Sequence, residues 1–502
     1  MHRLLAAAFA TLLSAVPAMA ADPTVSIDAG TLRGATDGTV DVYKGIPYAA
    51  PPVGDLRWMP PAPAVQWSGV RDATQFGAIC PQPPRPDLAI AQGAGQKQSE
   101  DCLFLNVWAP HGARHAPVMV WIHGGAHRFG ASSSPLYDGT EFARDGVILV
   151  SINYRLGLLG YFAHPALSRA AAPGAPLGNY GQMDQMAALL WVQRNIAAFG
   201  GDPANVTVFG ESAGGSSILF LLATPSAKGL FAKAIVESGG GWTPNTTLAD
   251  KENDGAAFAT RAGLPGADAT LAQLRALPVE KTFDTPPTLG FGPFADGRLV
   301  PVTPTVAFAR GTAIDVPLII GSNSFEASLM QSFRIPPDRV TARLTPQARA
   351  IYAGDDTNDE ALARAVFTDS IMGAPAHWIA SRASTGAPSW LYHFSYVTER
   401  RRGMVPGAAH GSEIPYVFAT GTVLAARFGI TLGADDLAME QLVHSCWVGF
   451  AKAGTPQCEN QVWPAYTPQN DQLLEFGSGT GVVSGFRKAQ YGALESVLLP
   501  GR

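Results

Sequence analysis

A large α/β fold, with a mostly parallel central sheet covered by helices on both faces, is predicted by two features of the sequence. Short apolar runs rich in β-branched residues alternate with segments of helical periodicity. These runs are apolar at nearly every position, which is typical of strands buried on both faces. The chain has 502 residues, and no linker, repeat or low-complexity segment divides it. We therefore expect one large domain over residues 21–502.

The N-terminal region alternates in the manner of strands, and Thr24–Arg33 with Val40–Ile46 predicts a hairpin across residues 36–38. Helical spacing over Tyr180–Phe199 ends at a glycine pair, as helices commonly do, and Ala213–Ala223 predicts a helix directly after a strand. The expected buried strands are Val118–Ile122, Val147–Ile152, Val206–Phe209, Ala234–Val236, Val316–Ile320 and Leu391–Phe394.

Residues 1–20 have the features of a secretory signal peptide. A basic start precedes an apolar stretch from Leu4 to Val16, and residues 18–20 supply the small-x-small pattern that signal peptidase accepts. The apolar stretch is shorter than the ~20 residues that a helix needs to span a bilayer, so a membrane anchor is the less favoured alternative. We expect cleavage after Ala20 and export to the periplasm or the medium.

Composition and charge exclude several classes of protein. Hydrophobic residues make up 47% of the chain and charged residues 15%, which fits a globular protein and not a disordered one. The net charge is −5 and no basic face stands out, so nucleic acid is not an expected partner.

Four cysteines predict two disulfides, because an exported chain meets an oxidising compartment. Sequence order favours Cys80 with Cys102 and Cys446 with Cys458, which both close short loops. The second loop, if unstrained, would stabilise the fold by roughly 2–3 kcal/mol. A zinc site is the rival interpretation, but neither pair has C-x-x-C spacing and no histidine stands at ligand spacing beside them, so we expect no metal.

The segment Gly210–Gly214 has the pattern G-x-S-x-G between a predicted strand and a predicted helix. In that context the pattern forms a strained turn that exposes the serine hydroxyl at the top of the sheet. Ser212 would then lie at a helix N-terminus, where free N–H groups favour developing negative charge. A chance glycine-rich turn is the alternative, and the flanking strand and helix argue against it.

A second glycine-rich segment, His123–Ala126, follows the predicted strand that ends at Ile122. Nucleophilic serine needs backbone N–H groups that stabilise an oxyanion, and a loop at this place supplies them. An ordinary strand-to-helix turn is the alternative. Two such segments, in this order along the chain, favour the catalytic interpretation.

Longer stretches around these motifs carry a specific pattern, and they are Phe199–Gly214, Glu100–Val107, Asn153–Gly157, Gly321–Asn323 and His410–Tyr416. Together they resemble the type-B carboxylesterase family, which includes bacterial carboxylesterases and cholinesterases. The resemblance extends from about Gly30 to Gly454, with Phe104 as a mild departure, and its motifs are highly specific when taken together. It implies an α/β-hydrolase fold with loop and helical insertions around an active-site gorge, and hydrolysis of a small-molecule ester without a cofactor.

The resemblance implies the catalytic residues that composition cannot choose. It implies Glu326 as the acid and His410 as the base, which gives the chain order serine, acid, histidine of this fold. The oxyanion donors implied are the N–H groups of Gly125, Ala126 and Ala213. The family often has glycine at the position of Ala126. Alanine keeps the N–H donor but its methyl group narrows the site, so we expect the methyl group to affect which substrates are accepted more than whether the protein is active.

Further implied roles are structural. Glu211, beside the nucleophile, and Ser238, after a buried strand, are expected to support the triad. The resemblance also implies the Cys80–Cys102 disulfide. The implied internal ion pairs are Arg57 with Glu100 and Arg155 with Asp184.

These residues predict acyl transfer from an ester to Ser212 and then to water, with Glu326 orienting His410. The base must be neutral, so we expect activity to fall below pH ~6–7. An amidase or thioesterase on the same scaffold stays open, because the same triad attacks any acyl group. A catalytically inactive binding protein is the least favoured alternative, since every catalytic element is present.

The sequence says less about which ester is cleaved. A cholinesterase of this family is expected to carry a tryptophan in its N-terminal disulfide loop for quaternary ammonium. Pro81–Asp101 contains no aromatic residue, which argues against choline esters. Arg128 and Arg400–Arg402 lie near the predicted catalytic loops and raise the hypothesis of an anionic substrate, with a solvated charge run as the more favoured interpretation. The sequence does not indicate an oligomeric state.

Overall fold

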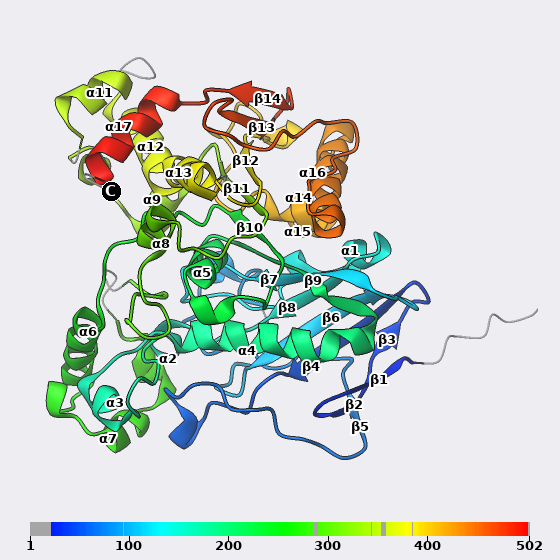
Figure 1. Cartoon of the computed structure of the whole chain (residues 1–502), viewed down its shortest axis with the longest axis vertical. Coiled ribbons are helices and arrows are strands. Elements are labelled where there is room, and N and C mark those ends of the chain that lie inside the picture. Colours follow the sequence, from blue (N-terminus) through cyan, green and yellow to red (C-terminus); the bar gives the residue numbers. More distant parts are fainter. Residues whose placement is uncertain are drawn as a thin grey trace, which may run out of the picture.

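The computed structural model describes residues 22–93, 95–285, 290–342, 344–352, 358–383 and 385–499. An eleven-stranded sheet runs through the molecule in the order β14-β13-β12-β11-β10-β9-β7-β8-β6-β4-β3 (Figure 1). Its strands are β3 (Ala35–Thr36), β4 (Val40–Pro47), β6 (Phe104–Pro110), β7 (Ala116–Ile122), β8 (Ile148–Ile152), β9 (Gly201–Glu211), β10 (Lys233–Glu237), β11 (Leu318–Asn323), β12 (Ser389–Phe394), β13 (Gln472–Phe476) and β14 (Gly481–Ser484).

The middle of this sheet is parallel, and its two edges are antiparallel. Strands β8, β7, β9, β10, β11, β12 and β13 pair in parallel, whereas β6, β4, β3 and β14 add on in antiparallel fashion. The carboxyl ends of parallel strands lie at one edge of a sheet, so the loops that follow β7, β9, β10 and β11 meet there. The predicted fold class is confirmed.

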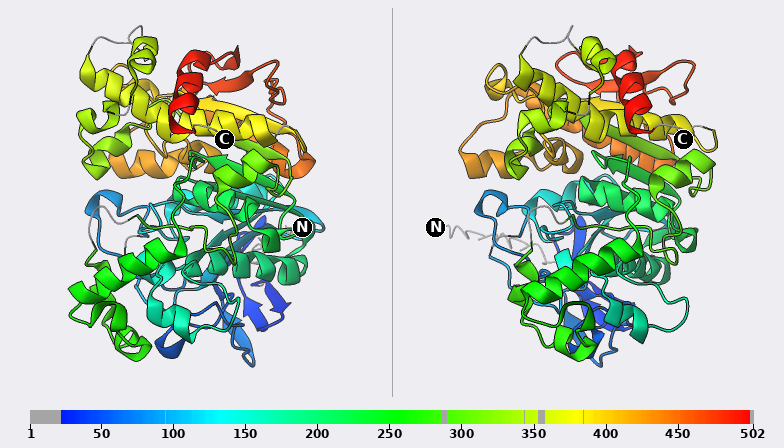
Figure 2. Two further views of the ribbon diagram at one scale, coloured as in Figure 1. Left: turned by 60° about the vertical axis from the view of Figure 1, so that its left-hand side comes forward. Right: turned by 90° about the vertical axis from the view of Figure 1, so that its left-hand side faces the viewer.

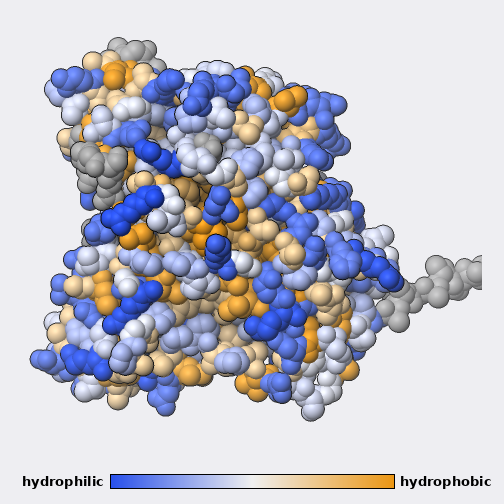
Figure 3. All heavy atoms as spheres, in the orientation of Figure 1, coloured by the Kyte–Doolittle hydropathy of each residue, from blue (hydrophilic) through white to orange (hydrophobic). Residues whose placement is uncertain are grey.

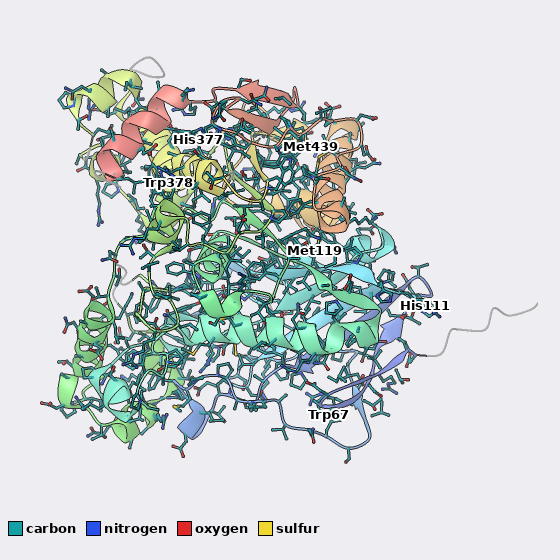
Figure 4. All side chains as sticks on the ribbon, viewed as in Figure 1. Trp67, His111, Met119, His377, Trp378 and Met439 are labelled. Atoms are coloured by element: carbon teal, nitrogen blue, oxygen red, sulfur yellow. A yellow bond between two sulfur atoms is a disulfide. The ribbon has the colours of Figure 1, made fainter. Side chains whose placement is uncertain are left out.

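Helices cover both faces of the sheet, and the alternation of side chains along each strand explains the two cores. On β7, Val118 and Val120 point into a core shared with α4, α5, α8 and α13, while Met119 and Trp121 point into a core shared with α1, α14 and α16. Figure 4 shows Trp378, a member of the first core, and Met439, a member of the second, on different helices. The helices of these layers are α1 (Thr140–Arg144), α4 (Tyr180–Asn195), α5 (Ala213–Leu222), α8 (Pro304–Arg310), α13 (Ala374–Ala383), α14 (Ile414–Phe418), α15 (Gly421–Phe428) and α16 (Ala434–Ala453).

The remaining helices form two groups beyond the ends of the strands (Figure 2). One group packs around Trp58 and Phe162, and the other around Tyr352 and Phe367. The first comprises α2 (Gly157–Gly160), α3 (Pro165–Ala170), α6 (Leu248–Arg261) and α7 (Leu271–Arg275), and the second α9 (Ser328–Phe333), α10 (Pro337–Thr341), α11 (Pro346–Tyr352), α12 (Asp359–Thr368) and α17 (Lys488–Leu498). These are the insertions that the fold class predicts.

The expected N-terminal hairpin is wrong in its pairing. Strands β1 (Thr24–Ile27) and β2 (Gly30–Arg33) pair with each other, and β2 also pairs with β5 (Val70–Asp72) in a separate small sheet. The chain reverses at residues 28–29, and Gly30, the first residue of β2, has a φ of 152°, which glycine adopts readily. Only the two residues of β3 pair with β4 across residues 37–39.

Both expected disulfides are present, between Cys80 and Cys102 and between Cys446 and Cys458. Within the described ranges, no helix is long and apolar enough to cross a membrane. The signal peptide expected over residues 1–20 lies outside those ranges. On the face drawn in Figure 3, hydrophobic side chains gather near the middle and hydrophilic ones surround them.

Candidate active site

Ser212 occupies the sharp turn between β9 and α5. Its backbone has φ 56° and ψ −120°, a strained conformation for a residue with a side chain. The N–H of Ser212 donates to the carbonyl oxygen of Glu237 at 2.8 Å, which fixes the turn against β10. A Cβ atom at Gly210 or Gly214 would collide with the carbonyl oxygen of Ile122. The two glycines of the pattern are therefore required by the close approach of β7.

Glu326 and His410 lie in contact at the same edge of the sheet. Nδ1 of His410 is 2.6 Å from Oε2 of Glu326, whose side chain is fully buried. The other carboxylate oxygen, Oε1, accepts hydrogen bonds from the Ser238 hydroxyl at 2.6 Å and from the Asn323 N–H at 2.7 Å. The N–H of His410 donates to the Ser328 hydroxyl at 3.0 Å. The carboxylate is thus fixed on one side and orients the imidazole on the other.

The second ring nitrogen of His410 faces a carboxylate as well. Nε2 lies 3.0 Å from Oε1 of Glu211, and among the described residues no hydrogen bond joins it to the Ser212 hydroxyl. Burial alone would lower the pKa of His410, but the carboxylates of Glu211 and Glu326 outweigh burial and raise that pKa above its usual 6.5. Burial raises the pKa of Glu211 to about 7. In the described structure Nε2 has no hydrogen-bond partner, so Glu211 acts on the ring through its charge and not through a hydrogen bond.

Two more buried carboxyl groups lie close to this pair. The indole N–H of Trp447 donates to Glu237 at 2.8 Å, and burial raises the pKa of Glu237 to about 8. The side-chain amide of Asn323 donates to Glu413, whose pKa burial raises well above its usual value. Uncharged carboxyl groups at these places avoid adding negative charge to an interior that already holds Glu211 and Glu326.

The loop after β7 turns tightly, and its Arg128 and Phe129 N–H groups both donate to the Gly125 carbonyl oxygen. Gly125, Ala126 and His127 have φ values of 103°, 54° and 54°, and a Cβ atom at Gly125 would collide with the Phe129 carbonyl. The described residues provide no hydrogen-bond acceptor for the N–H groups of Gly125, Ala126 or Ala213. Three unpaired donors around a nucleophile are what an oxyanion site requires.

His127 anchors that loop to α5. Its Nε2 lies 2.9 Å from the Ser217 hydroxyl, and burial lowers the pKa of His127 to about 3. The ring is therefore neutral at physiological pH, and its contact with Ser217 holds the loop against α5.

A cavity of about 340 Å³ opens beside Ser212, which is the size of a small-molecule site. It is mostly apolar, with hydroxyl groups at a few points and one charged side chain, Lys251, in its described lining. The described lining residues are Ala126, His127, Ser212, Ala213, Ser216, Phe220, Gly239, Thr243, Pro244, Thr246, Lys251, Gly290, Phe291, Gly292, Pro293, Phe294 and Met372.

The arginines that the sequence suggested for an anionic substrate lie outside this lining. Arg128 stacks 5.0 Å from the Phe291 ring centre and donates to Thr285, and Arg402 donates to Tyr396 and faces Asp435. Lys251 was missed, because a lysine in a polar helical stretch is indistinguishable in sequence from a solvated one. Within the described ranges, no group of three or more potential metal ligands exists.

The two expected ion pairs are formed. Arg155 donates through Nε and Nη2 to the two carboxylate oxygens of Asp184 at 2.7 Å each, and both side chains are buried. Arg57 donates in the same two-pronged manner to Glu100, at 2.7 and 2.5 Å. Neither pair belongs to the described lining of the cavity beside Ser212, so both are structural contacts.

Comparisons with known proteins show which family the chain belongs to. A model of the carboxylesterase family matches residues 21–494. The para-nitrobenzyl esterase of Bacillus subtilis (strain 168) is 39% identical, over 90% of this chain and 94% of that protein. The fumonisin B1 esterase of Sphingopyxis macrogoltabida is 38% identical, over 90% of this chain and 86% of that protein. A solved PNB esterase structure superposes with a TM-score of 0.83 at 35% identity, covering 94% of this chain and 99% of the other.

Proposed function

Because the chain belongs to the carboxylesterase family and is a carboxylic ester hydrolase, we propose that it works through an acyl-enzyme formed on Ser212. The observation that carries the proposal is the 2.6 Å contact between His410 and the fully buried Glu326. That contact fixes the ring tautomer so that Nε2, the nitrogen remote from Glu326, receives the serine proton.

In the first step Ser212 attacks the ester carbonyl and His410 takes the hydroxyl proton. The N–H groups of Gly125, Ala126 and Ala213 receive the oxyanion. His410 then gives the proton to the leaving alcohol, and a water molecule repeats the sequence to release the acid. Glu211 and Ser238 act as positioning residues, the first on Nε2 and the second on the Glu326 carboxylate.

The imidazole must be unprotonated at Nε2 to take the Ser212 proton. Nε2 lies 3.0 Å from a carboxylate oxygen of Glu211 and has no hydrogen-bond partner in the described structure, so this nitrogen is open to the Ser212 hydroxyl once the ring is neutral.

The test is hydrolysis of short p-nitrophenyl esters by residues 21–502 beside the Ser212→Ala variant. Loss of a triad serine costs several orders of magnitude in rate, so the variant should be nearly inactive while its melting temperature is unchanged. Equal turnover by both proteins would refute Ser212 as the nucleophile. Comparing p-nitrophenyl acetate with the matching anilide distinguishes an esterase from an amidase.

We also propose that the polypeptide forms one catalytic domain over residues 21–502 and is exported after cleavage at Ala20. The two disulfides support export, since such bonds persist in oxidising compartments. The names of the bacterial relatives, a fumonisin B1 esterase and a para-nitrobenzyl esterase, support small-molecule esters as substrates. N-terminal sequencing of the protein recovered from outside the cytoplasm tests both the export and the cleavage site.

A further inference from the structure

We propose that Lys251 binds a free carboxylate of the substrate, so that the enzyme prefers esters that carry one. This inference rests on the proposed function, since it concerns the cavity beside Ser212. It names the chemical class of substrate that the family assignment leaves open.

Helix α6 fixes the place of Lys251. The helix starts at a capping box in which the Thr247 hydroxyl accepts from the Asp250 N–H while the Asp250 carboxylate accepts from the Thr247 N–H. The next residue, Lys251, lines both this cavity and a smaller pocket that Asp254 also lines, and only 13% of its side chain is exposed. A lysine buried to this degree is uncommon unless it has a partner.

The ammonium group has little compensation in the described structure. Nζ donates to the Gly290 carbonyl at 3.0 Å, which uses one of its three N–H donors. The Asp254 carboxylate is 4.0 Å away with 46% of its side chain exposed, so solvent screens it. The Asp250 carboxylate already accepts a hydrogen bond from the Thr247 hydroxyl. Burial outweighs both aspartates and lowers the pKa of Lys251. A bound carboxylate would compensate the buried charge.

The cavity holds no competing charge in its described lining. Lys251 shares the lining with Ser212, the His127 ring is neutral, and no acidic side chain takes part. A cleft lined by one sign of charge with apolar walls concentrates ligands of the opposite sign. The hydroxyl groups of Thr243 and Thr246 in the same wall supply further donors for carboxylate oxygens.

No other cationic side chain belongs to the described lining of this cavity. The guanidinium of Arg128 stacks on Phe291 and donates to Thr285, and these three residues line a separate small pocket. Lys251 therefore provides the positive charge with which the described lining can select a substrate.

The experiment compares anionic and neutral esters of matched shape. One pair places the carboxylate on the acyl side, p-nitrophenyl hydrogen adipate against p-nitrophenyl hexanoate. The other pair places it on the alcohol side, meta-acetoxybenzoate against phenyl acetate. The ratio of kcat/KM within each pair is measured for the wild type, Lys251→Gln, Lys251→Arg and the surface control Lys228→Gln.

For at least one pair, the wild type should favour the anionic ester, and Lys251→Gln should lower the ratio about tenfold or more, mainly through KM. Added salt should weaken the preference, Lys251→Arg should retain most of it, and Lys228→Gln should match the wild type. A ratio unchanged by Lys251→Gln in both pairs, or an equal loss on both members of each pair, would overturn the proposal. Failure of the wild type to hydrolyse any of the four esters would instead count against the proposed function.

Discussion

Nε2 of His410 lies 3.0 Å from a carboxylate oxygen of Glu211, so the imidazole has an acidic neighbour at each ring nitrogen. The Glu326 contact is the one expected of a triad acid, whereas Glu211 lies at the nitrogen that the proposed mechanism assigns to the Ser212 proton. The arrangement holds the ring in place and also makes its proton harder to remove.

Glu211→Gln should shift the acidic limb of the pH–activity profile to lower pH. A carboxylate beside the imidazole stabilises its protonated form and raises the pKa of His410, and the neutral amide removes that effect. Because activity requires the neutral ring, the wild-type limb should lie above pH 6.5, the usual histidine value. Profiles of kcat/KM for both proteins measure the shift, and superimposable limbs would contradict the role of Glu211.

Glu237→Gln should make stability less dependent on pH. The pKa of Glu237 is raised from 4.5 to about 8 by burial, so the folded state holds this proton more tightly than the unfolded state. The stabilisation is complete below pH 4.5 and is lost as pH rises through about 8. Melting temperatures from pH 5 to 9 should therefore fall less steeply for the variant than for the wild type. Parallel curves would show that Glu237 is charged in the native protein.

Arg155→Met should destabilise the fold by about 3–5 kcal/mol, because it leaves the buried Asp184 carboxylate without its partner. The matched control is Arg364→Met, which removes an exposed partner of Glu360 and should cost at most about 1 kcal/mol. Thermal unfolding of both variants measures the difference. Equal losses would show that burial does not increase the contribution of the Arg155–Asp184 pair to the free energy of unfolding.

Ala126→Gly should widen the range of esters accepted. Ala126 lines the cavity with a φ of 54°, a conformation that glycine adopts without strain, and the substitution keeps the N–H donor while removing the methyl group. The kcat/KM for p-nitrophenyl pivalate relative to the acetate should rise about tenfold, in line with the value of one methyl group in a pocket. An unchanged ratio would show that this methyl group does not limit the site.

The sequence predicts the parallel centre of the sheet well and its edges poorly. Strands such as β7 and β10 are buried on both faces, and their continuous apolar runs are visible in sequence. The runs that form β6, β13 and β14 are not among the predicted strands, and β14 is both short and half-exposed. The N-terminal pairing depends on the reversal at residues 28–29, which alternation alone does not reveal.

The candidate site was also predictable only in part. Ser212, Glu326 and His410 stand in short motifs that resemble those of the family, and the structure brings Glu326 and His410 into contact. The approach of Glu211 to the ring and the position of Lys251 in the cavity wall depend on how distant segments pack. No local pattern encodes such contacts, so they emerge only from the folded chain.

The central claim is that Ser212 carries the acyl group, and covalent labelling tests it most directly. The protein is treated with a fluorophosphonate, residual esterase activity is followed, and the label is mapped by peptide mass spectrometry. The account predicts one adduct per chain, on Ser212, formed in step with the loss of activity and absent from Ser212→Ala. A label on another residue, or full activity in protein labelled at Ser212, would contradict it.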